Sequence, residues 1–378
     1  MVIKDTLSEL VSRKVLCPYC LSRISTKTAK YNCSFCGMDI TKAGVTGKYY
    51  CTDPAHRDKP VIISCPICGR ELPSSIFDYD DYMRFCLLGA TDTGKTNFLV
   101  TMIHELQHCK GTYWSCSHMD QETLDTFHYN EDAVYNEHRP ADNTLAGQGP
   151  QPMQWILQNG KKRTRSSIPT YSLTIFDGAG EDITAMTEDI KNYINGSNTL
   201  VILFDPLMLD KVAERMDPDK LAASTGSYGQ GQRKSAAELV TDITTYIKDA
   251  MKLKPNQLIN RNVAVVFTKF DMVLDEFGTG TVTQESPHMK HGGFVLSDCE
   301  AVDQEIRAWI ENNGGVQFLK NISNNFVDKK VKYFGVSSFG SAPGSGGLIA
   351  DVNPHRILDP IMWMMYNEGI IDRADEKA

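Results

Sequence analysis

The stretch RFCLLGATDTGKTNFLV, residues 84–100, decides the fold of this chain. Its middle, GATDTGKT (residues 89–96), fits the pattern G-x-x-x-x-G-K-[ST], in which backbone N–H groups at a helix N-terminus surround phosphate oxygens. The apolar residues before the first glycine are typical of a buried strand, and KTNFLVTMIHELQH after the second glycine is typical of an amphipathic helix. The sequence therefore predicts a phosphate-binding loop between a strand and a helix.

The residues of this loop have different expected roles. Lys95 should reach the β- and γ-phosphate oxygens, and Thr96 should ligate Mg²⁺. The residues expected to line the nucleotide here are Gly89, Asp92, Thr93, Gly94, Lys95, Thr96 and Asn97. The alternative is a glycine turn without function, which the strand and helix patterns on either side disfavour.

The next motif ends a second predicted strand, in YSLTIFDGAGED. Asp177 stands at the tip of this strand, where a carboxylate can support Mg²⁺ beside the phosphate loop. Gly180, three residues later, leaves space for a backbone N–H to face the γ-phosphate. We therefore expect Asp177 and Gly180 at the phosphate end of the nucleotide.

The base of the nucleotide is predicted from TKFD, residues 268–271, which follows the strand-like run NVAVVF. At the end of a strand, the Asp271 carboxylate can accept hydrogen bonds from guanine N1–H and the exocyclic amine, whereas adenine presents no such pair of donors. Thr268 opens the motif, and the stem of Lys269 can lie over the ring face. Ser337 and Ser338 follow the last predicted strand, KVKYFGVSS, where a backbone amide would meet guanine O6.

Other elements follow from local patterns. NTLVILFDP predicts a buried strand that ends at Phe204. SAAELVTDITTYIKDAM predicts a helix with a capping box formed by Ser235 and Glu238. DPIMWMMYNEG predicts a closing helix with Asp359 at its cap and Gly369 beyond its end.

The N-terminal part of the chain is rich in cysteine. Seven of the eleven cysteines fall between residues 17 and 68, as three C-x-x-C pairs and a C-x4-H pair. Two such pairs can close a tetrahedral zinc site, and with no open position the zinc would be structural. The expected ligands are Cys17, Cys20, Cys33, Cys36, Cys51, His56, Cys65 and Cys68. We expect two zinc ions, one of them completed by the C-x4-H pair, but the sequence leaves open which pairs share an ion.

Charge is divided between the two parts of the chain. Residues 1–80 hold 11 Lys and Arg against 8 Asp and Glu, a net charge of +3, while the whole chain carries −8. The acidic body disfavours broad nucleic-acid binding, and the weakly basic head leaves nucleic acid open for itself. No apolar run approaches the ~20 residues of a membrane span. Because MVIKDTLSELVSRKV lacks the apolar region of a signal peptide, we expect a cytoplasmic protein in a reducing compartment.

The motifs together carry a family resemblance. GATDTGKT, DGAG, TKFD and SS resemble the guanine-nucleotide motifs of Ras-like GTPases of the translation-factor class, over about residues 83–372. The cysteine-rich head, the long insert before TKFD and the closing NPHRILDPIMWMM look like the bacterial double-GTPase family, which is associated with multi-gene conflict or stress systems. The resemblance implies an α/β fold with a Ras-like sheet and helices on both faces. It also implies GTP/GDP with Mg²⁺, and a switch that works with protein partners.

The expected domains are a zinc-ribbon-like domain over residues 1–75 and a Ras-like P-loop GTPase domain with inserts over residues 76–378. Two segments, 223–235 and 276–294, are expected as loops between the motifs. Each is interpreted either as part of a recognition surface or as a disordered insertion.

Two further residues are expected in hydrolysis. In Ras-like sequences a glutamine often follows D-x-x-G and orients the attacking water, and here Glu181 stands in that place. PMQWILQNGKKRTR and PTYSLTIFD predict a hairpin that turns at Asn159–Gly160 and supplies the second and third strands of the domain. Because Thr164 falls inside that hairpin, Thr144 is the best-placed counterpart of the threonine that contacts Mg²⁺. Intrinsic turnover is expected to be slow, with a partner or a second copy supplying positive charge.

Two other interpretations stay open. One is a P-loop ATPase of another class, in which TKFD is accidental. The other is a nucleotide-stabilised scaffold that is not an enzyme and whose cysteine-rich head does the binding. The sequence does not indicate the partner, the trigger or the oligomeric state.

Overall fold

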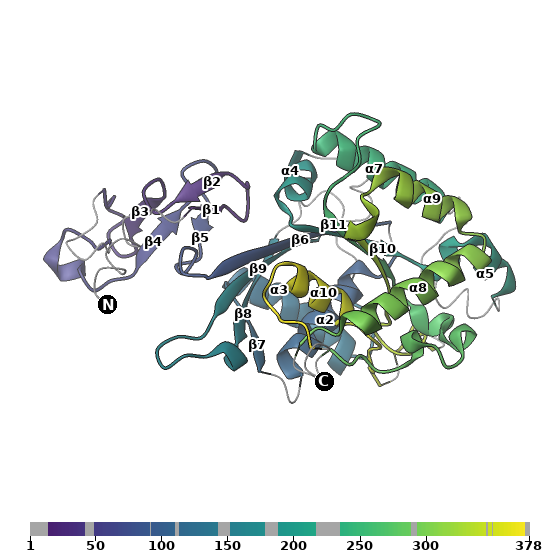
Figure 1. Ribbon diagram of the computed structural model, residues 1–378. Helices are drawn as coiled ribbons and strands as arrows, with labels where there is room; N and C mark the ends of the chain where they lie inside the picture. Colours follow the sequence, from purple (N-terminus) through teal and green to yellow (C-terminus); the bar gives the residue numbers. More distant parts are fainter. Residues whose placement is uncertain are drawn as a thin grey trace. The chain divides into compact units, whose positions relative to one another are not determined.

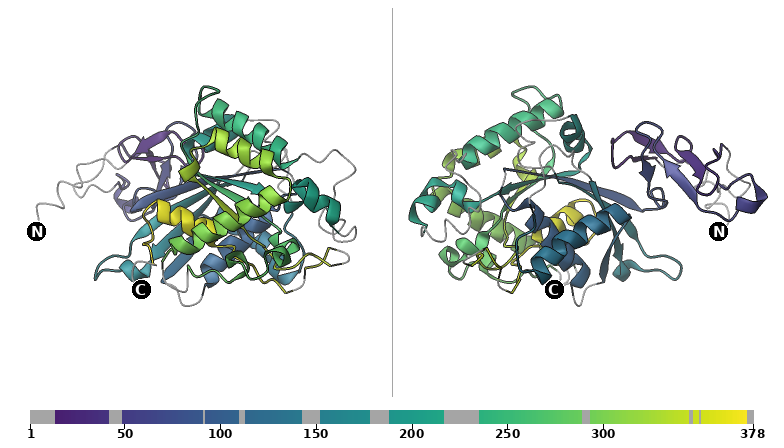
Figure 2. Two further views of the ribbon diagram at one scale, coloured as in Figure 1. Left: turned by 45° about the vertical axis from the view of Figure 1, so that its right-hand side comes forward. Right: turned by 180° about the vertical axis from the view of Figure 1, so that it is seen from behind.

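The computed structural model describes residues 14–41, 49–90, 92–109, 113–142, 152–177, 188–216, 235–288, 293–344, 347–349 and 351–374. The chain divides into two compact units, Met1–Tyr82 and Met83–Ala378 (Figures 1 and 2).

The first unit consists of short strands around a small core. The strands are β1 (Lys14–Leu16), β2 (Arg23–Ser25), β3 (Lys30–Cys33), β4 (Val61–Ser64) and β5 (Glu71–Leu72). β1 pairs with β2, and β4 lies between β3 and β5, all antiparallel. The core combines a few aliphatic side chains with buried cysteines. A unit of this size buries little apolar surface, so it needs a further source of stability such as a metal ion.

The second unit is built on one seven-stranded sheet. The strands are β6 (Asp81–Gly89), β7 (Trp114–His118), β8 (Pro152–Asn159), β9 (Thr170–Asp177), β10 (Thr199–Phe204), β11 (Asn262–Phe267) and β12 (Val331–Gly335), in the order β12-β11-β10-β6-β9-β8-β7. β6, β10, β11 and β12 pair in parallel, whereas β8 is antiparallel to both of its neighbours. β10 is buried along its whole length, as expected of a strand covered on both faces.

Helices cover both faces of this sheet, which confirms the predicted α/β fold class. They are α2 (Lys95–His108), α3 (Gln121–Glu131), α4 (Glu188–Gly196), α5 (Asp210–Arg215), α7 (Ala236–Ala250), α8 (Leu296–Asn312), α9 (Val316–Asn325) and α10 (Asp359–Asn367). Figures 1 and 2 show α4, α7 and α9 on one face and α2, α3 and α10 on the other. The core on the second face joins Phe98 and Ile103 of α2, Trp155 of β8 and Trp363 of α10.

Several local predictions are confirmed. β10 ends at Phe204, and Ser235 and Glu238 form the capping box of α7. The segment 276–288 contains only short 3-10 turns, η6 (Leu274–Phe277) and η7 (Thr281–Thr283), between irregular stretches. No helix in the described part of the chain is long and apolar enough to cross a membrane.

The start of α10 differs from the prediction. Asp359 is the first helical residue and the N-cap is Leu358. The Asp359 carboxylate does not cap the helix, because it accepts a hydrogen bond of 2.6 Å from Nε of Arg356. Gly369 does follow the end of the helix, with φ +70°.

The hairpin prediction was right about its two strands and wrong about their turn. β8 and β9 pair in antiparallel, but the chain between them runs over residues 160–169. Asn159 is still part of β8, where it pairs with Trp114 of β7, and Gly160 N–H donates to the Tyr113 carbonyl oxygen at 2.7 Å. Because β7 and α3 precede it, the hairpin supplies the third and fourth strands of the second unit, not the second and third.

Candidate nucleotide site and metal centres

The phosphate loop lies between β6 and α2. Gly94, which precedes the first residue of α2, has φ +76°, and Asp92 has φ +60°. A Cβ on Gly89 would lie 2.8 Å from Thr93 Oγ1 and 3.0 Å from the Leu203 carbonyl oxygen. Glycine is therefore required at the end of β6, because the loop passes close to both β6 and β10.

Lys95 is folded into this loop. Its Nζ donates to the carbonyl oxygens of Ala90 at 2.8 Å and Gly89 at 3.1 Å, and only 8% of the residue is exposed. Thr93 Oγ1 also donates to the Ala90 carbonyl oxygen, at 2.8 Å. The loop thus holds a buried cation at a helix N-terminus, which is the charge arrangement that binds phosphate.

The TKFD segment is joined directly to the phosphate loop. Thr268 Oγ1 lies 2.7 Å from the carbonyl oxygen of Thr93 and 3.1 Å from that of Phe204. Both loops leave the carboxyl ends of parallel strands, where ligands bind in open α/β sheets. The Thr268 hydroxyl therefore fixes the distance between the expected base end and the expected phosphate end of the site.

Lys269 has a partner that sequence reasoning missed. Its Nζ donates to Asp205 Oδ2 at 2.9 Å, and Asp205, just after β10, is 1% exposed. Lys269 itself has φ +50°, in the left-handed region. The ion pair fixes the Lys269 side chain along the edge of the site. The signal in the sequence was an aspartate directly after a fully buried strand.

Asp271 and the serines after β12 lie together. Ser337 Oγ donates to Asp271 Oδ1 at 2.6 Å and accepts from Gly340 N–H at 2.8 Å. Burial raises the pKa of Asp271, although the Ser337 hydrogen bond and the positive charge of Lys269 oppose that shift. Ser338 is buried next to Ser337. The arrangement places a carboxylate beside the backbone of the segment that the sequence assigns to guanine.

The remaining nucleotide residues divide into two groups. Thr96 is half-buried in the first turn of α2, and Asn97 Oδ1 accepts from Ala141 N–H at 2.8 Å, which ties α2 to the chain before residue 143. Asp177 is the last residue of β9, as predicted. Thr144, Gly180 and Glu181 lie outside the described residues.

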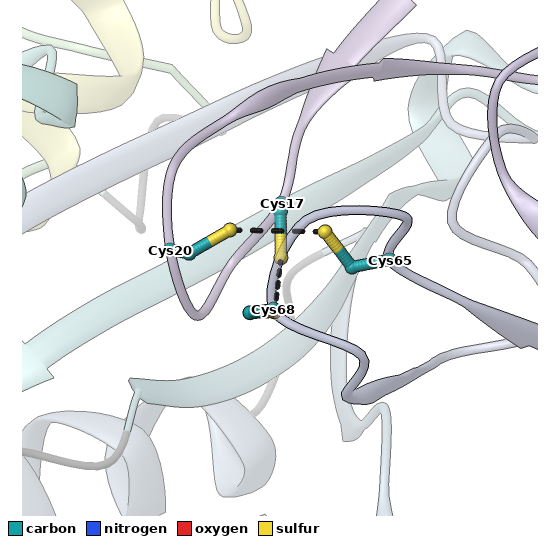
Figure 3. A group of neighbouring side chains, drawn as sticks. All are labelled: Cys17, Cys20, Cys65 and Cys68. Carbon is teal, nitrogen blue, oxygen red and sulfur yellow. Dashed lines mark hydrogen bonds between the residues drawn. The ribbon is translucent and has the colours of Figure 1, made fainter.

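The first metal centre combines the first and last cysteine pairs (Figure 3). Its candidate ligands are Cys17, Cys20, Cys65 and Cys68, whose Sγ atoms are turned toward one another. Cys17 Sγ is 3.8 Å from Cys68 Sγ, and Cys20 Sγ is 3.7 Å from Cys65 Sγ. Zn–S bonds of about 2.3 Å in a tetrahedron separate the sulfurs by about 3.8 Å, so the group has the dimensions of a zinc site.

The second centre combines the middle pair with the C-x4-H pair. Its residues are Cys33, Cys36, Cys51 and His56, and Cys36 Sγ is 3.7 Å from Cys51 Sγ. His56 Nδ1 is buried and has no hydrogen-bond partner among the described residues, although Asp53 Oδ2 lies 3.4 Å away. A buried nitrogen of this kind is suited to metal. The structure therefore pairs the cysteines, which the sequence left open.

The three C-x-x-C turns share one backbone shape. The residue after the second cysteine is left-handed in each, with φ +55° at Leu21, +69° at Gly37 and +74° at Gly69. Each donates its N–H to the carbonyl oxygen of the first cysteine, at 2.8–3.0 Å. Leu21 adopts a conformation that usually favours glycine, so the first turn carries strain that a bound ion would offset.

Replacing Cys17 and Cys20 together with serine should unfold the first unit while nucleotide binding persists, because the nucleotide residues all lie in the second unit. We expect the loss of at least one zinc per chain by elemental analysis, and rapid proteolysis confined to residues 1–82. Cys116→Ser in β7 is the control and should keep its zinc. A double variant with wild-type zinc content would show that these thiolates hold no ion.

Comparison with known proteins finds similarity among solved structures alone. No protein-family model matches the chain, and no curated protein matches its sequence. The GTPase-like domain of Ski7 from S. cerevisiae, bound to GTP, is similar with a TM-score of 0.33 and 11% identity, over 78% of this chain and 52% of that chain. The small GTPase Arl6 (BBS3) from Trypanosoma brucei, with bound GppNp, has a TM-score of 0.29 and 10% identity, over 77% and 99% of the two chains. The function is therefore inferred from the residues of the site.

Proposed function

We propose that the chain is a GTP-binding and GTP-hydrolysing switch that acts with protein partners. The observation that carries the proposal is the hydrogen bond from Thr268 Oγ1 to the Thr93 carbonyl oxygen, at 2.7 Å. It joins the loop that contains Lys95 to the loop that contains Asp271, although the two are far apart in sequence. A phosphate-binding loop and a base-binding loop are thereby held as one site.

The choice of guanine rests on Asp271. A carboxylate offers about four lone-pair positions, of which the Ser337 hydroxyl uses one. The others can accept from guanine N1–H and the exocyclic amine. Adenine has no matching pair of donors. It would displace water from the half-buried carboxylate without replacing the hydrogen bonds that the water made.

Mg²⁺ would be held by Thr96 and Asp177, where it would neutralise phosphate charge. Thr96 is next to Lys95 in the first turn of α2, and Asp177 ends the strand that neighbours β6 in the sheet. Hydroxyl and carboxylate oxygens are suitable ligands for this hard cation. Lys95 binds the β- and γ-phosphate oxygens, and the N–H groups of the loop orient them.

Competition between nucleotides tests this function. GTP and GDP should displace a fluorescent guanine nucleotide from the purified full chain in the presence of Mg²⁺, and ATP should not. Equal displacement by ATP would contradict the guanine assignment and favour an ATPase. Binding of GTP without any release of phosphate, alone or with a partner, would instead indicate a scaffold.

Glu181→Ala should lower GTP hydrolysis while GTP affinity stays the same or rises. A carboxylate at this position can accept a proton from the attacking water, but it also repels the γ-phosphate. Removing the carboxylate should therefore lower the rate of hydrolysis and relieve its repulsion of the γ-phosphate. Single-turnover phosphate release and equilibrium binding measure the two effects separately. If neither changes, Glu181 only contributes favourable charge to a helix N-terminus.

Partner binding is assigned to the first unit, in keeping with the resemblance to GTPases of bacterial conflict or stress systems. Its C-x-x-C turns expose large apolar side chains, with Phe35 67% and Ile67 69% exposed. Exposed apolar side chains on a small unit held together by metal ions suit a protein interface. Thiolate ligands fit a reducing compartment, so we place the protein in the cytoplasm. Slow intrinsic turnover would be raised by about 10³–10⁵-fold if a partner supplies an arginine.

A further inference from the structure

A third group of metal-ligating side chains lies in the second unit, between α2 and α3. His104 and His108 are one helical turn apart on α2, and Glu131 ends α3. The ligating atoms of the three residues lie within 4.8 Å of one another. The signal was present in the sequence, because residues 104–108 read HELQH and two histidines four apart share a helix face. From the sequence alone, this segment was interpreted only as a helix.

Hydrogen bonds fix which ring nitrogens carry protons. His108 Nδ1 is 2.9 Å from the carbonyl oxygen of His104, and a carbonyl can only accept, so this Nδ1 carries the proton. His104 Nδ1 is 2.7 Å from Glu131 Oε1, and it donates to the carboxylate in the same way. In each neutral ring, Nε2 then keeps its lone pair. Metal-bound histidines usually donate their other ring N–H to a carbonyl or a carboxylate, and both rings do so here.

The two rings are also held side by side. Their centroids are 4.0 Å apart with an interplanar angle of 25°, and the Tyr135 ring stacks on the opposite side of His104 at 3.7 Å. Zn–N bonds of about 2.0 Å hold two nitrogens about 3.3 Å apart in a tetrahedron. His108 is exposed, so its ring can tilt until its Nε2 and that of His104 reach this separation. α2 ends at His108, where the helix dipole favours a cation.

A second, independent feature lies beside the group. The π-helical turn η2 (Asp132–Asn136) begins directly after Glu131 and carries Tyr135 onto His104. Turns of this kind are rare and often occur at functional sites. The chain then continues to Ala141, whose N–H is bound by Asn97 of α2. The segment from α3 to residue 142 is therefore attached to α2 at both of its ends.

We propose that His104 and His108 bind a divalent transition-metal ion through their Nε2 atoms, with Glu131 orienting His104. Imidazole ligands suit zinc, copper and nickel, and zinc is the ion to test first. The remaining coordination positions are left to water or to an incoming ligand. The ion would fix the segment that leads to Thr144 against the helix that begins at Lys95. The proposal does not depend on which nucleotide the chain binds.

The test is zinc content and zinc-dependent stability of the full chain. Wild-type protein equilibrated with zinc chloride and then dialysed should hold one more equivalent than His108→Ala, by elemental analysis. Added zinc should raise the melting temperature of the EDTA-treated wild type. The rise should be smaller for His108→Ala, because this variant lacks the third zinc site. His128→Ala, at an exposed position on α3, is the matched control and should equal the wild type.

Glu131→Gln supplies a second variant that does not remove a ligand. Loss of an orienting carboxylate typically weakens metal affinity about 10–100-fold, so this variant should bind the third equivalent more weakly without losing it. Equal zinc content and an equal melting response in wild type, His108→Ala and Glu131→Gln would overturn the proposal. Guanine-nucleotide binding by each variant verifies that the second unit is folded.

Discussion

Lys95→Ala should reduce nucleotide binding to a small fraction of the wild-type affinity. The Lys95 ammonium is almost fully buried inside the phosphate loop, with Gly89 and Ala90 as its acceptors. Removing one partner of a buried charged pair costs about 3–5 kcal/mol. This corresponds to a loss of about 10²–10⁴-fold in affinity for GTP and for GDP alike.

The lysine also supports the loop itself, because a methyl side chain in its place would remove one donor from the carbonyl oxygens of Gly89 and Ala90. We therefore expect a lower melting temperature in addition to the loss of binding by isothermal titration. Lys320→Ala, on the exposed surface of α9, is the matched control and should change neither quantity. Affinity within about threefold of the wild type would mean that polyphosphate does not bind at residues 89–96, since loss of even one hydrogen bond to a charged group costs more.

Asp271→Asn should exchange guanine for xanthine. Xanthine carries an oxygen where guanine has its exocyclic amine, so it needs a donor at that position, and an asparagine amide supplies both a donor and an acceptor. Sites built around such hydrogen bonds reject the wrong partner by about 10⁴–10⁵-fold. Competition with XTP and GTP measures the reversal. Asp275→Asn, on an exposed residue of the same loop, should keep guanine preference.

Asp271→Asn should also change the stability of the folded protein when no nucleotide is bound. Burial raises the pKa of Asp271 in the folded state. The contribution of this group to stability is therefore present below its unfolded pKa and is lost as the pH rises through the folded pKa. Asparagine carries no charge to bury, so Asp271→Asn should unfold at higher urea than the wild type at neutral pH, and the difference should shrink on acidification. A less stable variant at neutral pH would show that the Asp271 carboxylate is stabilised by its neighbours instead.

The parts of the fold that the sequence predicted well are those encoded locally. The strand of β10 follows from an unbroken apolar run, and the capping box at Ser235 and Glu238 follows from a four-residue pattern. The α/β class with helices on both faces was implied by the resemblance to Ras-like GTPases, whose motifs are themselves short local patterns. Each of these depends on neighbours in the chain, so no tertiary information was needed.

The missed features depend on contacts between distant residues. β7 is an edge strand without a buried side chain, and the alternation of Trp114 and Cys116 with serines in WSCSH is too short to reveal it. Its pairing with β8 extends that strand through Asn159 and displaces the expected two-residue turn. The zinc pairing was likewise inaccessible, because the first centre joins the cysteine pair between β1 and β2 to the distant pair between β4 and β5. The ion pair of Lys269 with Asp205 joins loops after two different strands.

The hydrogen bond between Thr268 and Thr93 should lengthen the lifetime of the bound state. If the proposed nucleotide contacts both loops, separating them would ease its release, and this separation breaks a buried hydroxyl–carbonyl contact. Dissociation is then gated by the protein as well as by the strength of its contacts with the ligand. A factor that accelerates nucleotide exchange would need only to pull the TKFD loop away from the phosphate loop, and could do so without touching the phosphates. Thr268→Val keeps the shape of the side chain and removes its hydrogen-bond donor. This variant should therefore release nucleotide faster without an added factor.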